Sequence, residues 1–176
     1  MKQLTHYDIK NKQQLFPITI VCDAIRTPEN IGMCFRISES FGVQKIFLHD
    51  SSPSIKNRNV SRTARNTINQ IEHAIYSDFN LLINQLKKEG NTIIGIEITD
   101  DSINIQDFDF TATEKIVLLL GSERNGIENI DLLDATVAIP MYGRNSSMNV
   151  IHSLSIALYE TTNQLNKKNV ITNIVK

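Results

Sequence analysis

Cysteine is scarce in this sequence and neither sign of charge is in excess, and each absence excludes a class of protein. The two cysteines, Cys22 and Cys34, lie in apolar segments and lack the spacing of a disulfide framework or a zinc site. Such thiols are typical of a reduced cytosolic protein. Lys and Arg number 18 against 19 Asp and Glu, and the formal net charge of -1 excludes a uniformly basic surface. An anionic partner therefore requires a local basic patch.

Long apolar runs are also absent. No segment approaches the length that crosses a bilayer, and residues 1–16 lack the apolar core of a signal peptide. We therefore expect a cytoplasmic protein with no membrane partner, and the four histidines show no spacing that would predict a metal. With 41% hydrophobic residues, the chain suits one domain over residues 1–176, with an N-terminal arm (1–16) and a C-terminal tail (166–176) that is frayed or docked on a partner.

Short apolar runs alternate with amphipathic segments along the chain, which predicts an α/β fold. The runs that we interpret as strands cover residues 18–24, 44–48, 92–98, 115–120 and 136–139. The segments that we interpret as helices cover residues 28–41, 77–88 and 150–160, with a further short helix around 58–65 and a solvated acidic loop at 100–114. The pattern favours a mostly parallel sheet with helices on both faces.

The segment 139–160 changes abruptly from small polar residues to a helix with one apolar face, so its polar residues are held at a buried helix N-terminus. Either Ser147 or Asn149 can cap that helix, while neighbouring polar groups are free to meet a ligand. Two more polar loops, 27–36 and 121–127, also follow apolar runs. Because open parallel sheets bind ligands at the carboxyl ends of their strands, we expect the three loops to form one site. A capped core helix without a ligand is the simpler alternative.

All seven arginines fall in or beside these loops or in the stretch after the second strand. The guanidinium group offers a planar set of donors that suits phosphate, so their placement predicts a phosphate-bearing partner. Ordinary surface salt bridges are the alternative. Arg36 lies beside an apolar helix face, where we expect partial desolvation, and there the alternative is an ion pair with Glu39 or Glu123.

Three segments together resemble a known family. PENIGMCFRISESFGV, LLLGSERNGI and IPMYGRNSSMNVIHSLSIALYE occur in the order and at the separations of the three motifs of the SpoU (TrmH-type) group of SPOUT RNA 2'-O-ribose methyltransferases. The resemblance covers the chain from about Ile18 to Glu160. It implies the SPOUT fold, a parallel α/β sheet with a C-terminal deep trefoil knot. It also implies a homodimer that binds S-adenosyl-L-methionine in the knot, next to residues of the other subunit.

The resemblance also assigns site residues. Around the reacting ribose it implies a catalytic set of Asn30, Arg36, Glu123, Ser147 and Asn149. For the cofactor it implies contacts from Ile96, Glu97, Gly121, Ile139, Met141, Ser147 and Met148. The other arginines are then expected to bind RNA: Arg26, Arg58, Arg62, Arg65, Arg124 and Arg144.

The implied reaction is an in-line attack of a ribose 2'-hydroxyl on the sulfonium methyl, and its central residue is Arg36. The family assigns to the matching arginine the activation of that hydroxyl. A guanidinium is effectively always protonated, so we expect Arg36 to stabilise the developing alkoxide and grip the adjacent phosphate. The proton then leaves through water or phosphate.

Two features depart from the family pattern: Asn66-Thr67 stands where relatives often carry Gly-Ala, and His152 stands where small or aliphatic residues are usual. We interpret His152 as a packed or interfacial side chain. The chain has no room for a separate RNA-binding domain, which favours tRNA over rRNA as the substrate.

Other enzyme classes are disfavoured because the sequence lacks GxGxxG after its first strand, GxxxxGK[ST] and GxSxG. A catalytically inactive RNA-binding homodimer is the remaining alternative.

Overall fold

The computed structural model of this chain describes residues 3–4, 8 and 13–174, with side chains through residue 168. Its strands are β1 (Phe16–Cys22), β2 (Val43–His49), β3 (Glu72–Tyr76), β4 (Thr92–Ile96), β5 (Ile103–Asn104), β6 (Ile116–Leu120) and β7 (Ala135–Ala138). Its α-helices are α1 (Pro28–Ser40), α2 (Arg58–Ala64), α3 (Phe79–Lys88) and α4 (Val150–Ile174), with 3-10 turns at Thr67–Asn69, Phe110–Ala112 and Ile130–Leu132.

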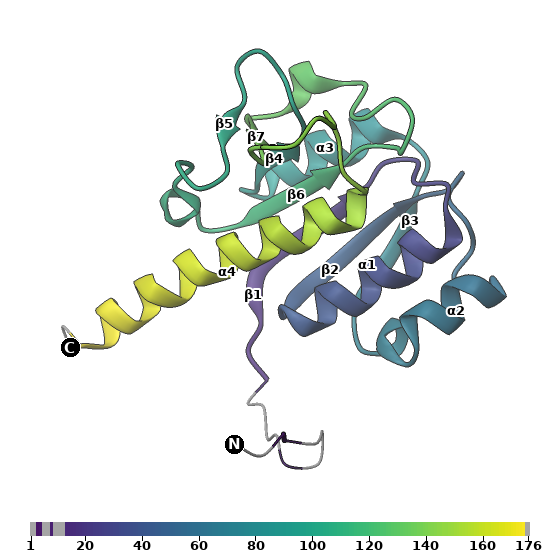
Figure 1. The fold of residues 1–176 in the computed structure, drawn as a ribbon, viewed down its shortest axis with the longest axis horizontal. Coiled ribbons are helices and arrows are strands. Elements are labelled where there is room, and N and C mark those ends of the chain that lie inside the picture. The colour runs from purple at the N-terminus through teal and green to yellow at the C-terminus, as the bar shows by residue number, and fades with distance from the viewer. Residues whose placement is uncertain (1–2, 5–7, 9–12, 175–176) are drawn as a thin grey trace.

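The seven strands form one sheet in the order β3-β2-β1-β6-β4-β7-β5, and every neighbouring pair is parallel (Figure 1). The central strand β6 is apolar at all five positions and completely buried, as expected for a parallel strand covered on both faces. The predicted α/β fold with a parallel sheet is therefore confirmed. All carboxyl ends point to one edge, which we call the carboxyl edge.

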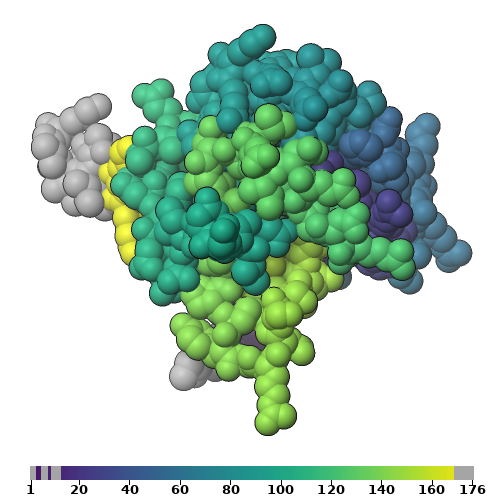
Figure 2. All heavy atoms as spheres, turned by 90° about the horizontal axis from the view of Figure 1, so that it is seen from above, coloured from purple at the N-terminus to yellow at the C-terminus, as the bar shows by residue number. Residues whose placement is uncertain are grey.

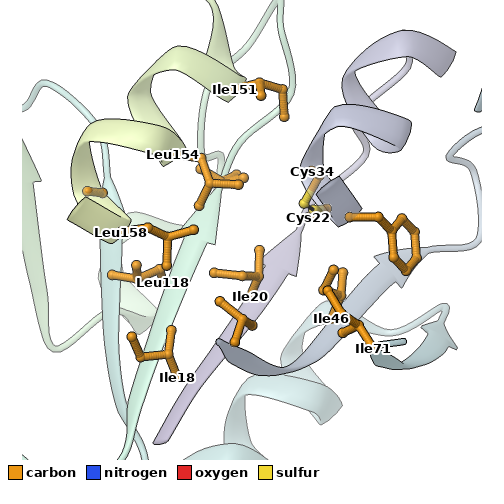
Figure 3. Packing of buried hydrophobic residues seen from close by; sticks show 14 of the residues in the cluster. Ile18, Ile20, Cys22, Cys34, Ile46, Ile71, Leu118, Ile151, Leu154 and Leu158 are labelled. Carbon is orange, nitrogen blue, oxygen red and sulfur yellow. Dashed lines mark hydrogen bonds between the residues drawn. The ribbon is translucent and has the colours of Figure 1, made fainter. Parts of the chain in front are cut away.

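Helices cover both faces of the sheet, as the alternating pattern predicted. On one face, α1 and α4 pack over β1, β2 and β6, and Figure 3 shows Leu154 and Leu158 of α4 above Ile20 and Leu118 of the sheet. On the other face, α3 packs over β6 and β4 through a second apolar cluster that includes Ile83. Both layers hold the strands rigidly, so the loops that leave the carboxyl edge start from fixed positions.

Gly121 shapes the carboxyl edge where β6 ends. A Cβ atom at this position would lie 2.0 Å from the carbonyl carbon of Gly126, so the loop can fold back on itself only because Gly121 has no side chain. The returning segment is held by the backbone pair of Ser122 and Gly126, in which each N–H donates to the other carbonyl at 3.0 and 3.1 Å. This tight return places the residues of loop 121–127 directly over the end of the sheet.

Several elements differ from the sequence prediction. The edge strands β3 and β5 were not predicted: β3 has exposed or half-exposed residues at four of its five positions, and β5 has only two residues, inside the expected acidic loop. Within the predicted tail at 166–176, residues 166–174 continue the helix α4, which ends at Ile174. No glycine or proline follows Gly143, so nothing in the backbone ends the helix earlier. Most of the predicted arm (1–16) lies outside the described residues, and Phe16 already belongs to β1.

None of the helices that the structure describes combines the length and apolar character needed to span a bilayer.

Candidate active site

A cavity of about 390 Å³ opens at the carboxyl edge, between the ends of β4, β6 and β7 and the segment that leads into α4. Figure 2 looks down on this edge, and the yellow-green segment around residues 140–150 projects there from the body. All seven residues predicted to contact a cofactor line this cavity: Ile96, Glu97, Gly121, Ile139, Met141, Ser147 and Met148. Residues that are up to 52 positions apart in the sequence therefore meet around one space, and their role as cofactor ligands stays a prediction.

Three residues of the predicted catalytic set form a continuous chain of hydrogen bonds at the mouth of this cavity. The side-chain amide of Asn149 donates to Oδ1 of Asn30 at 3.2 Å, and Nδ2 of Asn30 donates to Oε1 of Glu123 at 2.9 Å. Each residue comes from a different one of the three loops. Asn30 is only 8% exposed, so its orientation is fixed by these two partners.

Glu123 is held as a carboxylate by the start of α1. Its oxygens accept hydrogen bonds from the backbone N–H groups of Arg26 (2.9 Å) and Thr27 (3.0 Å), in addition to the Asn30 amide. Partial burial acts to raise the pKa of Glu123, but these donors outweigh it and lower the pKa to about 2. The side chain is therefore negatively charged throughout the physiological range, and it ties loop 121–127 to loop 27–36.

Asn149 is the cap of α4, which decides between the two caps that the sequence allowed. Its Oδ1 accepts from the N–H of Ile151 at 2.8 Å, and its carbonyl accepts from the N–H groups of His152 and Ser153. Capping by Oδ1 turns the amide nitrogen toward Asn30. Ser147 lines the cavity instead, and its hydroxyl has no hydrogen bond within the described residues.

Arg36 lies apart from the cavity of its own chain. It sits on the exposed side of α1, and it is not among the cavity-lining residues. The expected partial desolvation is therefore wrong for the single chain, because Cys34 and Phe35 take the buried positions of this turn. Neither Glu39 nor Glu123 pairs with its guanidinium, which forms no ion pair with any residue that the structure describes.

The six arginines predicted to bind RNA are all exposed. Arg62 pairs with Glu29 at 3.7 Å, and no other arginine side chain in the described ranges forms an ion pair. Surface salt bridges therefore do not explain the other five. Arg58 and Arg62 lie on the short helix α2, which packs against α1.

The structure gives the predicted residue Glu97 a second role, and it shows an exposed aromatic residue, Tyr142, that the sequence analysis did not single out. The carboxylate of Glu97 accepts from the N–H of Ile98 at 3.0 Å and from the N–H of Ile127 at 3.1 Å, so it joins the end of β4 to loop 121–127. Tyr142, in the segment between Ile139 and Met148, is 94% exposed. A large aromatic ring inside a polar, glycine-containing segment was the available signal.

In the part of the chain that the structure describes, no three His, Cys, Asp or Glu side chains are grouped closely enough to hold a metal ion. The His152 side chain is exposed on α4, so it is not packed within this chain.

A cavity at the carboxyl edge of a parallel sheet, lined by loops that follow buried strands, is the arrangement of α/β proteins that bind a small ligand. A profile of the SpoU rRNA Methylase family matches residues 17–159, and the chain belongs to that family.

Individual relatives agree with this assignment. The chain is 27% identical over 172 residues to the "23S rRNA (guanosine-2'-O-)-methyltransferase RlmB" of Blochmanniella floridana, which covers 97% of this chain and 66% of that protein. It is 30% identical over 165 residues to an "Uncharacterized tRNA/rRNA methyltransferase" of Borreliella burgdorferi, covering 89% of this chain and 68% of that one. The chain thus spans only about two thirds of the length of these relatives.

A solved structure shows the same fold. The SpoU methyltransferase AviRb from Streptomyces viridochromogenes, in complex with the cofactor AdoMet, superposes with a TM-score of 0.78 at 22% identity. The match covers 93% of this chain and 65% of that one.

Proposed function

We propose that this protein is an S-adenosylmethionine-dependent RNA 2'-O-ribose methyltransferase. The observation that carries the proposal is the hydrogen-bonded chain Asn149–Asn30–Glu123 at the mouth of a cavity lined by all seven predicted cofactor residues. Family membership and the names of the two relatives support it. A structural role alone would not require three polar side chains to converge beside an open cavity.

The cavity fits S-adenosylmethionine in size and in chemistry. Its volume of about 390 Å³ lies in the range of small-molecule sites. Ile96, Ile139 and Met148 offer apolar walls for a heterocycle, while Glu97 and Ser147 offer polar groups. When bound, the cofactor supplies an electrophilic methyl group on a sulfonium.

The protein's task is to align the acceptor hydroxyl and to stabilise the charge that develops on it. Asn30 and Asn149 are fixed in orientation by their mutual hydrogen bond, so the mouth of the cavity needs little reorganisation when RNA binds. The Glu123 carboxylate retains lone pairs that can accept a hydrogen bond from the ribose. The proton of the 2'-hydroxyl leaves through water or a phosphate oxygen.

We also propose that Arg36 acts in the cavity of a second copy of the chain. Its position outside its own cavity and its unpaired guanidinium support a site completed across a homodimer. On α4, Ile156 is 39% exposed and Tyr159 is 63% exposed, which leaves an apolar stripe beside α1 for a partner helix. At the partner's site, Arg36 stabilises the alkoxide and binds the adjacent phosphate.

The remaining structural proposals follow the family resemblance. We propose that residues 1–176 form one methyltransferase domain that works in the cytoplasm, and that its C-terminal part is threaded as a deep trefoil knot. The strand order supports the knot, because the late strand β7 lies between the earlier β4 and β5, and the chain then returns as α4 to the α1 face. A crystal structure with an unthreaded path from β6 to α4 would contradict it.

RNA is the proposed substrate, with tRNA placed first and rRNA second. The unpaired arginines near the cavity support a phosphate-bearing partner. The relative from Blochmanniella floridana, named as a 23S rRNA enzyme, favours the second candidate.

The test combines two measurements on the wild-type protein. Calorimetry measures binding of S-adenosylmethionine, and mass spectrometry then detects new 2'-O-methylnucleosides in separate tRNA and rRNA pools. We expect cofactor binding and one new 2'-O-methylnucleoside, in the pool that contains the substrate. Cofactor binding without methylation of either pool would instead support an inactive RNA-binding homodimer.

A further inference from the structure

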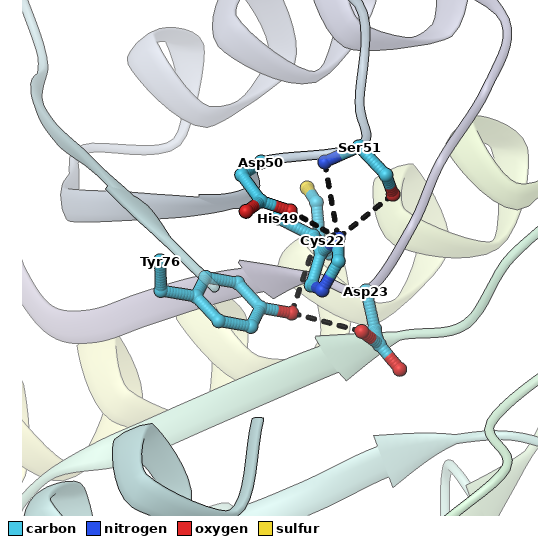
Figure 4. Close-up of polar contacts among 6 residues, drawn as sticks. All are labelled: Cys22, Asp23, His49, Asp50, Ser51 and Tyr76. Carbon is cyan, nitrogen blue, oxygen red and sulfur yellow. Dashed lines mark hydrogen bonds and ion pairs between the residues drawn. The ribbon is translucent and has the colours of Figure 1, made fainter. Parts of the chain in front are cut away.

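A second polar cluster lies at the carboxyl edge, on the side of β1 away from the cavity. Asp23 follows β1, His49 ends β2 and Tyr76 ends β3, so three neighbouring strands deliver these side chains to one place (Figure 4). The backbone N–H of Asp23 donates to the carbonyl of Leu120 at 2.8 Å, and Leu120 lines the cavity. The cluster therefore borders the proposed methyl-transfer site, although no step described above uses it.

The Asp23 carboxylate is held in place from one side only. The Tyr76 hydroxyl donates to Oδ1 of Asp23 at 3.0 Å and also lies 3.4 Å from the carbonyl of Cys22. Burial and the adjacent Asp23 raise the pKa of Tyr76, so this hydroxyl stays a donor. Oδ2 of Asp23 accepts no hydrogen bond from any residue in the described ranges.

The tyrosine is itself fixed by its neighbours. The His49 ring packs edge-on against it with 5.2 Å between ring centroids, and the Ser51 N–H lies 3.2 Å from Nδ1 of His49. Half-burial raises the pKa of Asp23, while the Tyr76 bond and His49 act to lower it. A carboxylate kept partly desolvated, with one oxygen anchored and the other open, is prepared to accept hydrogen bonds from a ligand.

We propose that Asp23 recognises the base of the methylated nucleotide and selects guanine by accepting hydrogen bonds from its N1–H and N2–H. This inference rests on the proposed function and specifies its substrate. Guanine presents two adjacent N–H donors on its Watson–Crick edge, which match the two oxygens of one carboxylate. Adenine and cytosine present a single amino group beside an acceptor nitrogen, and uracil presents a single N–H beside two carbonyls.

We expect a base bound at the carboxyl edge to come within reach of Asp23. Glu123 accepts from the backbone N–H of Arg26, which is three residues after Asp23 and therefore at most about 11 Å away along the chain. A nucleotide whose ribose lies beside Glu123 can extend its base along loop 23–26 toward the β1 end. The Tyr76 hydroxyl then acts as a positioning group, since it orients the carboxylate without touching the base.

The first test identifies the product nucleoside. RNA from cells that lack this protein is incubated with the full chain and S-adenosylmethionine, and the four 2'-O-methylnucleosides are quantified by mass spectrometry. We expect 2'-O-methylguanosine as the new product, reduced tenfold to a hundredfold by Asp23→Asn, the usual cost of an unmade hydrogen bond to a charged group. Asp131→Asn is the matched control, because this carboxylate is exposed and has no hydrogen bond or ion pair among the described residues, and we expect it to retain wild-type yield.

The second test uses the wild-type protein alone, so it does not depend on how a variant folds. Once the target position is mapped, an RNA with inosine at that position lacks the 2-amino donor of guanosine. We expect the wild-type protein to methylate the inosine RNA at least tenfold more slowly than the guanosine RNA. For Asp23→Asn we expect these two rates to differ by less than threefold. A variant that no longer distinguishes the two RNAs is a result that a merely structural role of Asp23 would not produce.

The outcomes separate this inference from the proposed function. A new 2'-O-methylated adenosine, cytidine or uridine would overturn guanine selection while leaving the methyltransferase intact. Equal rates on the guanosine and inosine RNAs would overturn it as well. Absence of any new 2'-O-methylnucleoside, with the cofactor bound, would overturn the proposed function and this inference together.

Discussion

Asn30 offers a direct way to perturb the link between the three loops of the site. Its amide nitrogen donates to the Glu123 carboxylate at 2.9 Å, and its Oδ1 accepts from Asn149. Asn30→Asp keeps the shape of the side chain but replaces the donor that faces Glu123 with a second carboxylate oxygen. Because Asn30 is only 8% exposed, the new charge cannot turn to solvent. The substitution therefore places two acceptors and two negative charges at hydrogen-bond distance.

The size of the effect follows from these two changes. Loss of a hydrogen bond to a charged group costs about 1.5–3 kcal/mol. Repulsion between the carboxylates adds about 1–2 kcal/mol, because the exposure of Glu123 screens the interaction well below its value in a dry interior. We expect Asn30→Asp to lower the free energy of unfolding by about 2.5–5 kcal/mol at pH 8.

The loss depends on pH with a definite sign. Repulsion raises the pKa of the new carboxyl group in the folded state above its unfolded value of about 3.9. The folded state then binds more protons than the unfolded state, so the deficit shrinks as pH falls from 8 toward 5. Asn30→Ala also loses the hydrogen bonds, but it introduces no charge, so its deficit stays constant over that range.

Urea denaturation of both variants at pH 8 and pH 5 measures these differences. Asn84→Asp is the matched control, because Asn84 is exposed on α3 and its side chain has no hydrogen bond among the described residues. We expect Asn84→Asp to change the free energy of unfolding by less than about 0.5 kcal/mol at either pH. If Asn30→Asp unfolds at the wild-type urea concentration at pH 8, the hydrogen-bonded chain does not join the loops as described.

Three further predictions concern RNA and turnover. Arg36→Ala should lower turnover by a hundredfold to a thousandfold while the cofactor affinity measured by calorimetry stays unchanged, and near wild-type turnover would refute its role. Tyr142→Ala should weaken RNA binding by about 5- to 150-fold in filter-binding assays, the value of one stacked base, without changing stability, since the ring is 94% exposed; equal affinity would exclude stacking. Arg65 has φ 57° and ψ -123° at the end of α2, a conformation that glycine adopts with less strain. Arg65→Gly should therefore raise the free energy of unfolding by about 1 kcal/mol while it weakens RNA binding. Arg58→Gly, within the helix, should lower the free energy of unfolding and also weaken RNA binding.

The position of the site could be predicted from the sequence because its signals are local. An apolar run followed by small polar residues marks the end of a buried strand, and this pattern located the loops that begin at Gly121 and Ile139. The cap at Asn149 was one of two local alternatives. The edge strand β3 was not predicted, because a strand at the edge of a sheet needs few apolar residues. The full length of α4 was not predicted, because its only signal is the absence of a glycine or proline that would end the helix.

Contacts between distant residues could not be predicted in the same way. The family resemblance grouped Asn30, Glu123 and Asn149, but which donor meets which acceptor depends on the register of β1 against β6 and on the close return of the chain at Gly121. The exposure of Arg36 depends on which side of α1 faces the sheet. Asp23 gave no signal at all, because one aspartate after a strand is common.

The most direct test of the central claim is a mixed dimer of Arg36→Ala and Glu123→Ala chains, purified through two different tags and assayed for 2'-O-methylation of RNA. If Arg36 serves the partner's cavity, one of the two sites has both wild-type residues and the other has neither. We then expect two inactive homodimers and a mixed dimer with about half of the wild-type activity. A folded mixed dimer as inactive as its parents would contradict a site shared between two chains, and with it the proposed role of Arg36.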